Sequence, residues 1–140
     1  MSGVEDTKRD DVELDKRLDE VLGSDFIRKL LNSSKTGFFL TRKSIAIMGF
    51  SIGIPILYSS REYMLRNLFR SALYDKKLLN LIDVIKNYAI SIREIYKEIS
   101  SKYEILSPLI GENLKKVEDF LQELEGIKNK LTQIQDSEVT

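Results

Sequence analysis

The sequence contains neither cysteine nor histidine. Without cysteine the chain can form no disulfide, offers no thiolate nucleophile and cannot bind zinc through sulfur. Without histidine it lacks the commonest general base and the commonest metal ligand. The remaining acidic, basic and hydroxyl residues form no recognisable catalytic set. We therefore expect a protein that needs no cofactor, binds no metal and is not an enzyme.

An excess of charge of one sign is also missing. The 140 residues include 22 Lys plus Arg and 22 Asp plus Glu. Nucleic-acid binding depends on neutralising several phosphates, which this balance does not favour. The N-terminal residues also lack the basic and apolar regions of a signal peptide. We expect protein partners, self-association or membrane lipid, and no nucleic acid.

One segment has no charged residue at all. Residues 44–60 contain no Asp, Glu, Lys or Arg, although these make up 31% of the chain. Arg42 and Lys43 precede this run and Arg61 follows it. As a helix the run would be about 25 Å long, close to the roughly 30 Å hydrocarbon core of a bilayer. We predict a transmembrane helix over residues 37–61 and therefore a single-pass membrane protein.

Two features of this run suggest further contacts in a membrane. Gly49 and Gly53 are four residues apart, a spacing that lets a second helix approach closely, although they could instead accommodate a bend at Pro55. Basic side chains on both sides of the run would contact lipid headgroups. The residues predicted for headgroup contact are Arg42, Lys43, Arg61, Arg66 and Arg70.

Large apolar residues repeat every seven positions in the C-terminal half. The first series is Leu78, Ile85, Ile92, Ile99 and Leu106, and the second is Ile110, Val117, Leu124 and Leu131. Between them, Ser107 and Pro108 suit the start of a helix. Two amphipathic helices with a short connection favour an antiparallel hairpin, here over residues 78–135.

The hairpin has about three apolar positions per heptad on each helix, more than two helices bury between them. We therefore expect the stripe to contact a partner helix as well as to form core. The residues predicted for partner contact are Ile85, Tyr88, Ile92, Ile95, Tyr96, Ile99, Val117, Phe120, Leu124 and Ile127.

Together these segments predict an all-α fold: a single membrane-spanning helix followed by an extended helical stalk and an antiparallel, coiled-coil-like helical hairpin. The expected divisions are a disordered tail (1–11), an amphipathic helical segment (12–36), the transmembrane helix (37–61), a basic juxtamembrane helix (62–77), the hairpin (78–135) and a second tail (136–140).

The expected function is that of a non-catalytic, membrane-anchored adaptor or assembly subunit, which binds partner proteins through the apolar hairpin stripe. Two alternatives remain open at this point. The first is a soluble helical-bundle subunit of a larger complex, with residues 44–60 as its central core helix. The second is a carrier of lipid or another small molecule.

Overall fold

The structure is a computed structural model that describes the backbone of residues 3–139 and the side chains of residues 11–134. Every regular element in this part of the chain is helical, which confirms the all-α prediction. The elements are α1 (Gly3–Leu22), α2 (Phe26–Leu31), α3 (Ser33–Thr36), α4 (Arg42–Ser51), α5 (Arg61–Tyr74), α6 (Leu78–Lys102), a 3-10 turn (Glu104–Leu106) and α7 (Ser107–Val139).

The two terminal segments predicted as tails are largely helical. Helix α1 begins at Gly3 and α7 continues to Val139. Residues 1, 2 and 140 lie outside the described residues.

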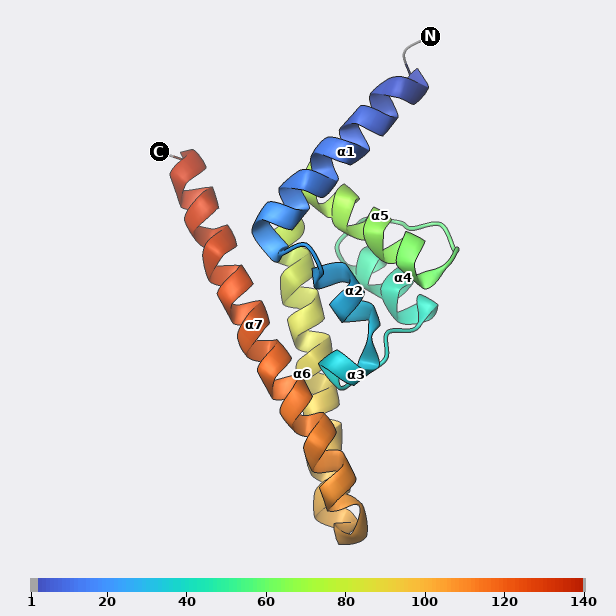
Figure 1. The fold of residues 1–140 in the computed structure, drawn as a ribbon, viewed down its shortest axis with the longest axis vertical. Helices are drawn as coiled ribbons and strands as arrows, with labels where there is room; N and C mark the ends of the chain where they lie inside the picture. Colours follow the sequence, from blue (N-terminus) through green and yellow to red (C-terminus); the bar gives the residue numbers. More distant parts are fainter. Residues whose placement is uncertain (1–2, 140) are drawn as a thin grey trace.

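Helices α6 and α7 form the expected antiparallel hairpin, which is the longest feature of the molecule (Figure 1). Leu81 and Ile85 from α6 share one buried cluster with Phe120 and Leu124 from α7. At the connection, the Ser107 hydroxyl donates to the Ser100 carbonyl at 3.2 Å and so ties the start of α7 to α6.

Helices α2 to α5 pack against one side of this hairpin (Figure 1). Five aromatic rings lie at and beside the junction between the two parts. Phe26 lies 5.9 Å from Phe69 and 6.0 Å from Phe120, measured between ring centroids. Phe38 lies 5.6 Å from both Phe120 and Tyr88. Aromatic pairs at these separations add to the stability that apolar burial already provides.

The predicted membrane-spanning helix is wrong. Within the described residues, no helix combines the length and the apolar character that crossing a bilayer requires. The uncharged run folds instead as α4, which ends at Ser51, and a non-helical return that leads to α5 at Arg61. The transmembrane assignment of residues 37–61, the single-pass membrane localisation and the membrane-spanning part of the fold class are therefore corrected.

The turn after α4 explains why the helix stops. Gly53 has a φ of 76° and donates its N–H to the Phe50 carbonyl at 3.1 Å. Ile54 donates to the Gly49 carbonyl at 2.8 Å. This pair of bonds is a Schellman turn, which closes a helix with a left-handed residue, most often glycine. A continuous helix through residues 44–60 is incompatible with it.

The run is also less buried than a central core helix would be. Ile45, Met48 and Ile54 are buried, whereas Phe50, Leu57 and many of the remaining side chains are exposed. Helix α4 therefore lies at the edge of the bundle and presents one side to solvent.

The segment predicted as a basic juxtamembrane helix, residues 62–77, is mainly α5, an internal part of the bundle. Met64, Leu65, Leu68, Phe69 and Ala72 are all completely buried. Ser60 caps this helix, because its side chain accepts from the Tyr63 N–H at 3.2 Å.

Candidate interaction surfaces

Five of the ten residues predicted for partner contact lie in the chain's own core. They are Ile85, Val117, Phe120, Leu124 and Ile127. Tyr88, Ile92, Tyr96 and Ile99 are partly covered, and Ile95 is exposed. The structure therefore leaves Ile95 as the most accessible of the predicted positions.

Tyr88 and Tyr96 hold the segment between α3 and α4. The Tyr88 hydroxyl donates to the Phe39 carbonyl at 3.3 Å, and the Tyr96 hydroxyl donates to the Gly37 carbonyl at 2.5 Å. Burial raises the pKa of Tyr96, and neighbouring Tyr88 raises it further. Gly37 has a φ of 85°, and a side chain there would lie 2.5 Å from the Asn113 carbonyl. The two tyrosines thus fix the backbone of residues 37–39, where the chain passes very close to α7.

Two of the arginines predicted for headgroup contact have partners within the bundle. Arg61 donates to the Leu40 carbonyl at 2.6 Å, and its guanidinium lies 3.9 Å from the Phe39 ring centroid. Arg70 forms a two-pronged pair with Asp15, at 2.7 and 2.8 Å, which holds α1 against α5. The hydrogen bonds from Arg70 are the main cause of the lowered pKa of Asp15.

The other three basic residues lie nearer to solvent. Arg66 pairs with Glu62 on the same helix at 3.1 Å, and the Arg42 guanidinium lies 5.2 Å from the Tyr58 ring centroid. Lys43 is exposed. The headgroup role assigned to these residues, and the helix-packing role assigned to Gly49 and Gly53, rested on a membrane-spanning helix and are withdrawn with it.

A first candidate surface is the hairpin tip, which we define as Ile95, Tyr103, Ile105, Leu106 and Leu109. All five side chains are exposed. Ile105 is 89% exposed and Leu109 is 65% exposed. In Figure 1 this end of the hairpin extends well past α3 and the other helices of the bundle. The tip is therefore an apolar surface at the end of a projecting arm.

A second candidate is a groove between α4 and α6, with a volume of about 410 Å³. We call it the α4–α6 groove. Its lining has no charged residue and consists of Ser44, Ile47, Met48, Ser51, Val84, Asn87, Tyr88 and Ser91. Met48 is buried, Ser44, Val84 and Tyr88 are partly buried, and the other lining residues are exposed.

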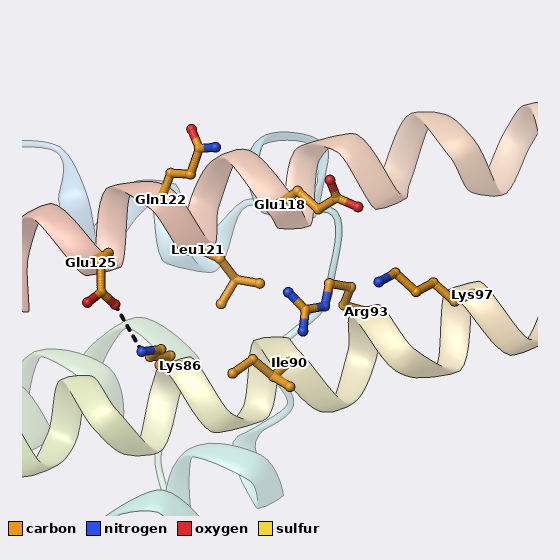
Figure 2. A pocket seen from close by; sticks show the side chains of 8 residues that line it. All are labelled: Lys86, Ile90, Arg93, Lys97, Glu118, Leu121, Gln122 and Glu125. Carbon is orange, nitrogen blue, oxygen red and sulfur yellow. Dashed lines mark hydrogen bonds and ion pairs between the residues drawn. The ribbon is translucent and has the colours of Figure 1, made fainter.

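A third surface lies on the other side of α6, where α6 and α7 enclose a groove of about 390 Å³ (Figure 2). Its lining is mostly charged, and Lys86 pairs with Glu125 across it at 2.9 Å. That hydrogen bond lowers the pKa of Glu125. Figure 2 shows Arg93 reaching into the space between the helices, with Leu121 on α7 above Ile90 on α6. The charges are of both signs, so this groove favours neither an anionic nor a cationic ligand.

The described residues contain no cluster of three or more acidic residues that could bind a metal ion. Every buried side-chain nitrogen and oxygen in the described part of the chain has a hydrogen-bond partner. The polar groups that the fold buries are thus used for structure.

Sequence reasoning missed most of the hairpin tip. Of its five residues, only Ile95 was assigned to partner contact. The sequence signal that could have revealed the tip is the Ile105–Leu106 pair beside Leu109. These residues lie at the turn between two helices, where no facing helix can cover them.

No family model matches the chain, and no significant match is found among curated proteins or solved structures. The functional argument therefore rests on the surfaces described above.

Proposed function

We propose that this protein is a non-catalytic helical-bundle subunit of a larger assembly, and that it binds a partner protein through the hairpin tip. One observation carries the proposal: the tip gathers exposed apolar side chains at the end of an arm that leaves the bundle (Figure 1). Contiguous exposed apolar surface on a folded domain usually marks a contact site.

The composition of the tip fits a protein contact. Its apolar residues are bordered by charges of both signs, Lys102, Glu104 and Glu112. An apolar centre with a polar rim is the usual arrangement of a protein–protein interface. The partner should present an apolar recess that receives Ile105 and Leu109, because these two side chains are the most exposed of the five.

A carrier of lipid or another small molecule has less support. Binding sites for such ligands are concave and cover most of the ligand surface. The most apolar groove described here is open, because Ile47, Ser51 and Asn87 in its lining are exposed.

The test places charges in the centre of the tip. The double variant Ile105→Asp/Leu109→Asp should fold normally, because substitution of exposed residues changes stability little. A photo-crosslinking amino acid at position 103, in chains expressed in the native cells, should give a discrete protein adduct, and the double variant should lose it.

The matched control is Ser101→Asp, which adds a charge at an exposed position of the same arm without removing an apolar group. It should retain the adduct. The proposal fails if no adduct forms in the unmodified chain, or if the adduct persists in the double variant.

A further inference from the structure

We infer that the α4–α6 groove binds a second copy of this chain, with the two α6 helices antiparallel across a two-fold axis. This contact shares only Ile95 with the hairpin tip. It does not depend on the partner proposed above, and each of the two proposals can fail without the other.

The face of α6 that lines the groove continues beyond it in both directions. Six residues share this side of the helix, because they recur at intervals of three and four residues or are neighbours in the sequence. They are Asn80, Val84, Asn87, Tyr88, Ser91 and Ile95. None of them is charged. Lys77 falls on this side at one end, and Glu94 and Glu98 fall on it at the other end. The face is therefore uncharged between Lys77 and Glu94, with one basic and one acidic end.

Helix α4 supplies the second wall. Ser44, Ile47, Met48 and Ser51 also share one side of their helix. Ile47 is 57% exposed and Ile95, at the far end of the face, is 48% exposed. The opposite groove of the hairpin is lined mainly by charged residues, so the uncharged surface is confined to one side of α6. An apolar, uncharged occupant fits this side.

The order of residues along α6 is self-complementary. Across a two-fold axis, if residue i of one copy contacts residue j of the other, then residue j of the first copy also contacts residue i of the second. With the axis between Asn87 and Tyr88, Lys77 of each copy lies opposite Glu98 of the other. The remaining opposed pairs are Asn80 with Ile95, Val84 with Ser91, and Asn87 with Tyr88.

The two charged ends are able to form these contacts. Glu98 pairs with Lys102 on its own helix at 2.9 Å, and both side chains are exposed. Exposed pairs of this kind contribute little stability, so Glu98 can exchange its partner. The Lys77 ammonium lies beside Gly53, at the end of the groove where α4 stops.

The size of the face sets the expected strength of the contact. From residue 77 to residue 98 a helix rises about 30 Å, and two helices side by side are about 20 Å wide. Because α4 is only about 15 Å long, this gives about 450 Å² per copy and about 900 Å² in total, which is the size of a weak, transient interface. The expected product is a reversible dimer.

Exchanging the charges of Lys77 and Glu98 tests the proposed register of the two α6 helices. Sedimentation equilibrium of the full chain should show a dimer. Lys77→Glu and Glu98→Lys should each weaken it at least about tenfold, because each puts two like-charged pairs into the symmetric contact. The double variant should restore it. Lys97→Glu makes the same charge change on the opposite side of α6 and should leave the dimer unchanged.

A cysteine placed near the axis gives a second test that does not depend on those charges. The chain has no cysteine, so a single one reports only its own position. Asn87→Cys should form a disulfide-linked dimer under mild oxidation, since the two copies of residue 87 meet at the axis. Position 101 is also exposed but lies about 40 Å from its counterpart in this register, so Ser101→Cys should not form one.

Three results would overturn the inference. The first is an unmodified chain that remains a monomer at about 1 mM, where even a weak specific dimer forms. The second is a dimer that neither Lys77→Glu nor Glu98→Lys weakens. The third is disulfide formation at position 87 that does not exceed formation at position 101.

Discussion

Replacing Gly49 or Gly53 with alanine distinguishes the observed turn from a continuous helix. The two structures predict changes of opposite sign in the free energy of unfolding. In an uninterrupted helix, either substitution would raise the free energy of unfolding by about 1 kcal/mol, because alanine is the better helix former. In the structure, both glycines belong to the Schellman turn that ends α4. We expect both substitutions to lower the free energy of unfolding.

The magnitudes follow from the local geometry. Gly53 has a φ of 76°, where a residue with a Cβ loses about 1–2 kcal/mol. A Cβ on Gly49 would lie 2.5 Å from the Ile54 carbonyl oxygen. That atom belongs to the backbone of the turn and cannot move without breaking it. We expect Gly49→Ala to cost about 1–3 kcal/mol, the usual range for an overpacked site.

Urea unfolding followed by circular dichroism measures both changes, and Gly126→Ala is the matched control. Gly126 lies within α7, and nothing comes within 4 Å of a Cβ built there. This control should raise the free energy of unfolding by about 1 kcal/mol. If Gly49→Ala and Gly53→Ala stabilise the protein as the control does, the turn is refuted and residues 44–60 form one helix.

Three further substitutions test other parts of the fold. Lys76→Gly should raise the free energy of unfolding by about 1 kcal/mol, because Lys76 has a φ of 60° after α5, a conformation that glycine adopts without strain. Tyr96→Phe should lower it by about 1 kcal/mol, since it removes the hydrogen bond to the Gly37 carbonyl. Asp15→Asn should lower it by up to about 1 kcal/mol at neutral pH, a small value because the Asp15 side chain is 37% exposed and water screens its pair with Arg70.

The pH dependence of the Asp15 pair has a definite sign. Its pKa is lowered in the folded chain, chiefly by hydrogen bonds from Arg70. The pair therefore contributes fully above the ordinary pKa of an aspartate and loses its contribution as the pH falls through the lowered pKa. Asp15→Asn should flatten this part of the acid dependence.

Each of these three substitutions can be contradicted by urea unfolding at several pH values. A Lys76→Gly chain no more stable than the original would mean that Lys76 is not strained. Unchanged stability of Tyr96→Phe would show that the Gly37 contact contributes nothing. An acid dependence that Asp15→Asn leaves unaltered would place the titrating group elsewhere.

The hairpin could be predicted from the sequence because its signal is regular and local. Leucine, isoleucine and valine every seven residues define one side of each helix, and a short connection with Pro108 leaves little choice of arrangement. The same pattern could not separate core from surface. Phe120 and Ile95 both belong to the stripe, yet only the position of α2 to α5 decides that Phe120 is buried and Ile95 is exposed.

The path of residues 44–60 could be predicted less well, although a signal was present. A glycine after the last helical residue and a proline soon afterwards are typical of a helix end, and Gly53 and Pro55 have this spacing. The prediction of a membrane-spanning helix gave more weight to the absence of charge in the run than to this helix-end signal. Its apolar residues are needed for a different reason: Ile45, Met48 and Ile54 reach the core from both sides of the turn.

The roles of the arginines could not be predicted from local sequence at all. Arg70 lies 55 positions from Asp15, and Arg61 lies 21 positions from Leu40. Only the packing of α1 and of the segment before α4 brings these groups together. An arginine beside an apolar run therefore carries little information about its partner.

The path of residues 44–60 decides whether the α4–α6 groove exists, and backbone chemical shifts measured by nuclear magnetic resonance test it most directly. We predict helical shifts from residue 42 to 51, a left-handed glycine at 53, non-helical shifts from 54 to 60 and helical shifts again from 61. Unbroken helical shifts from residue 44 to residue 60 would contradict the fold and remove the groove.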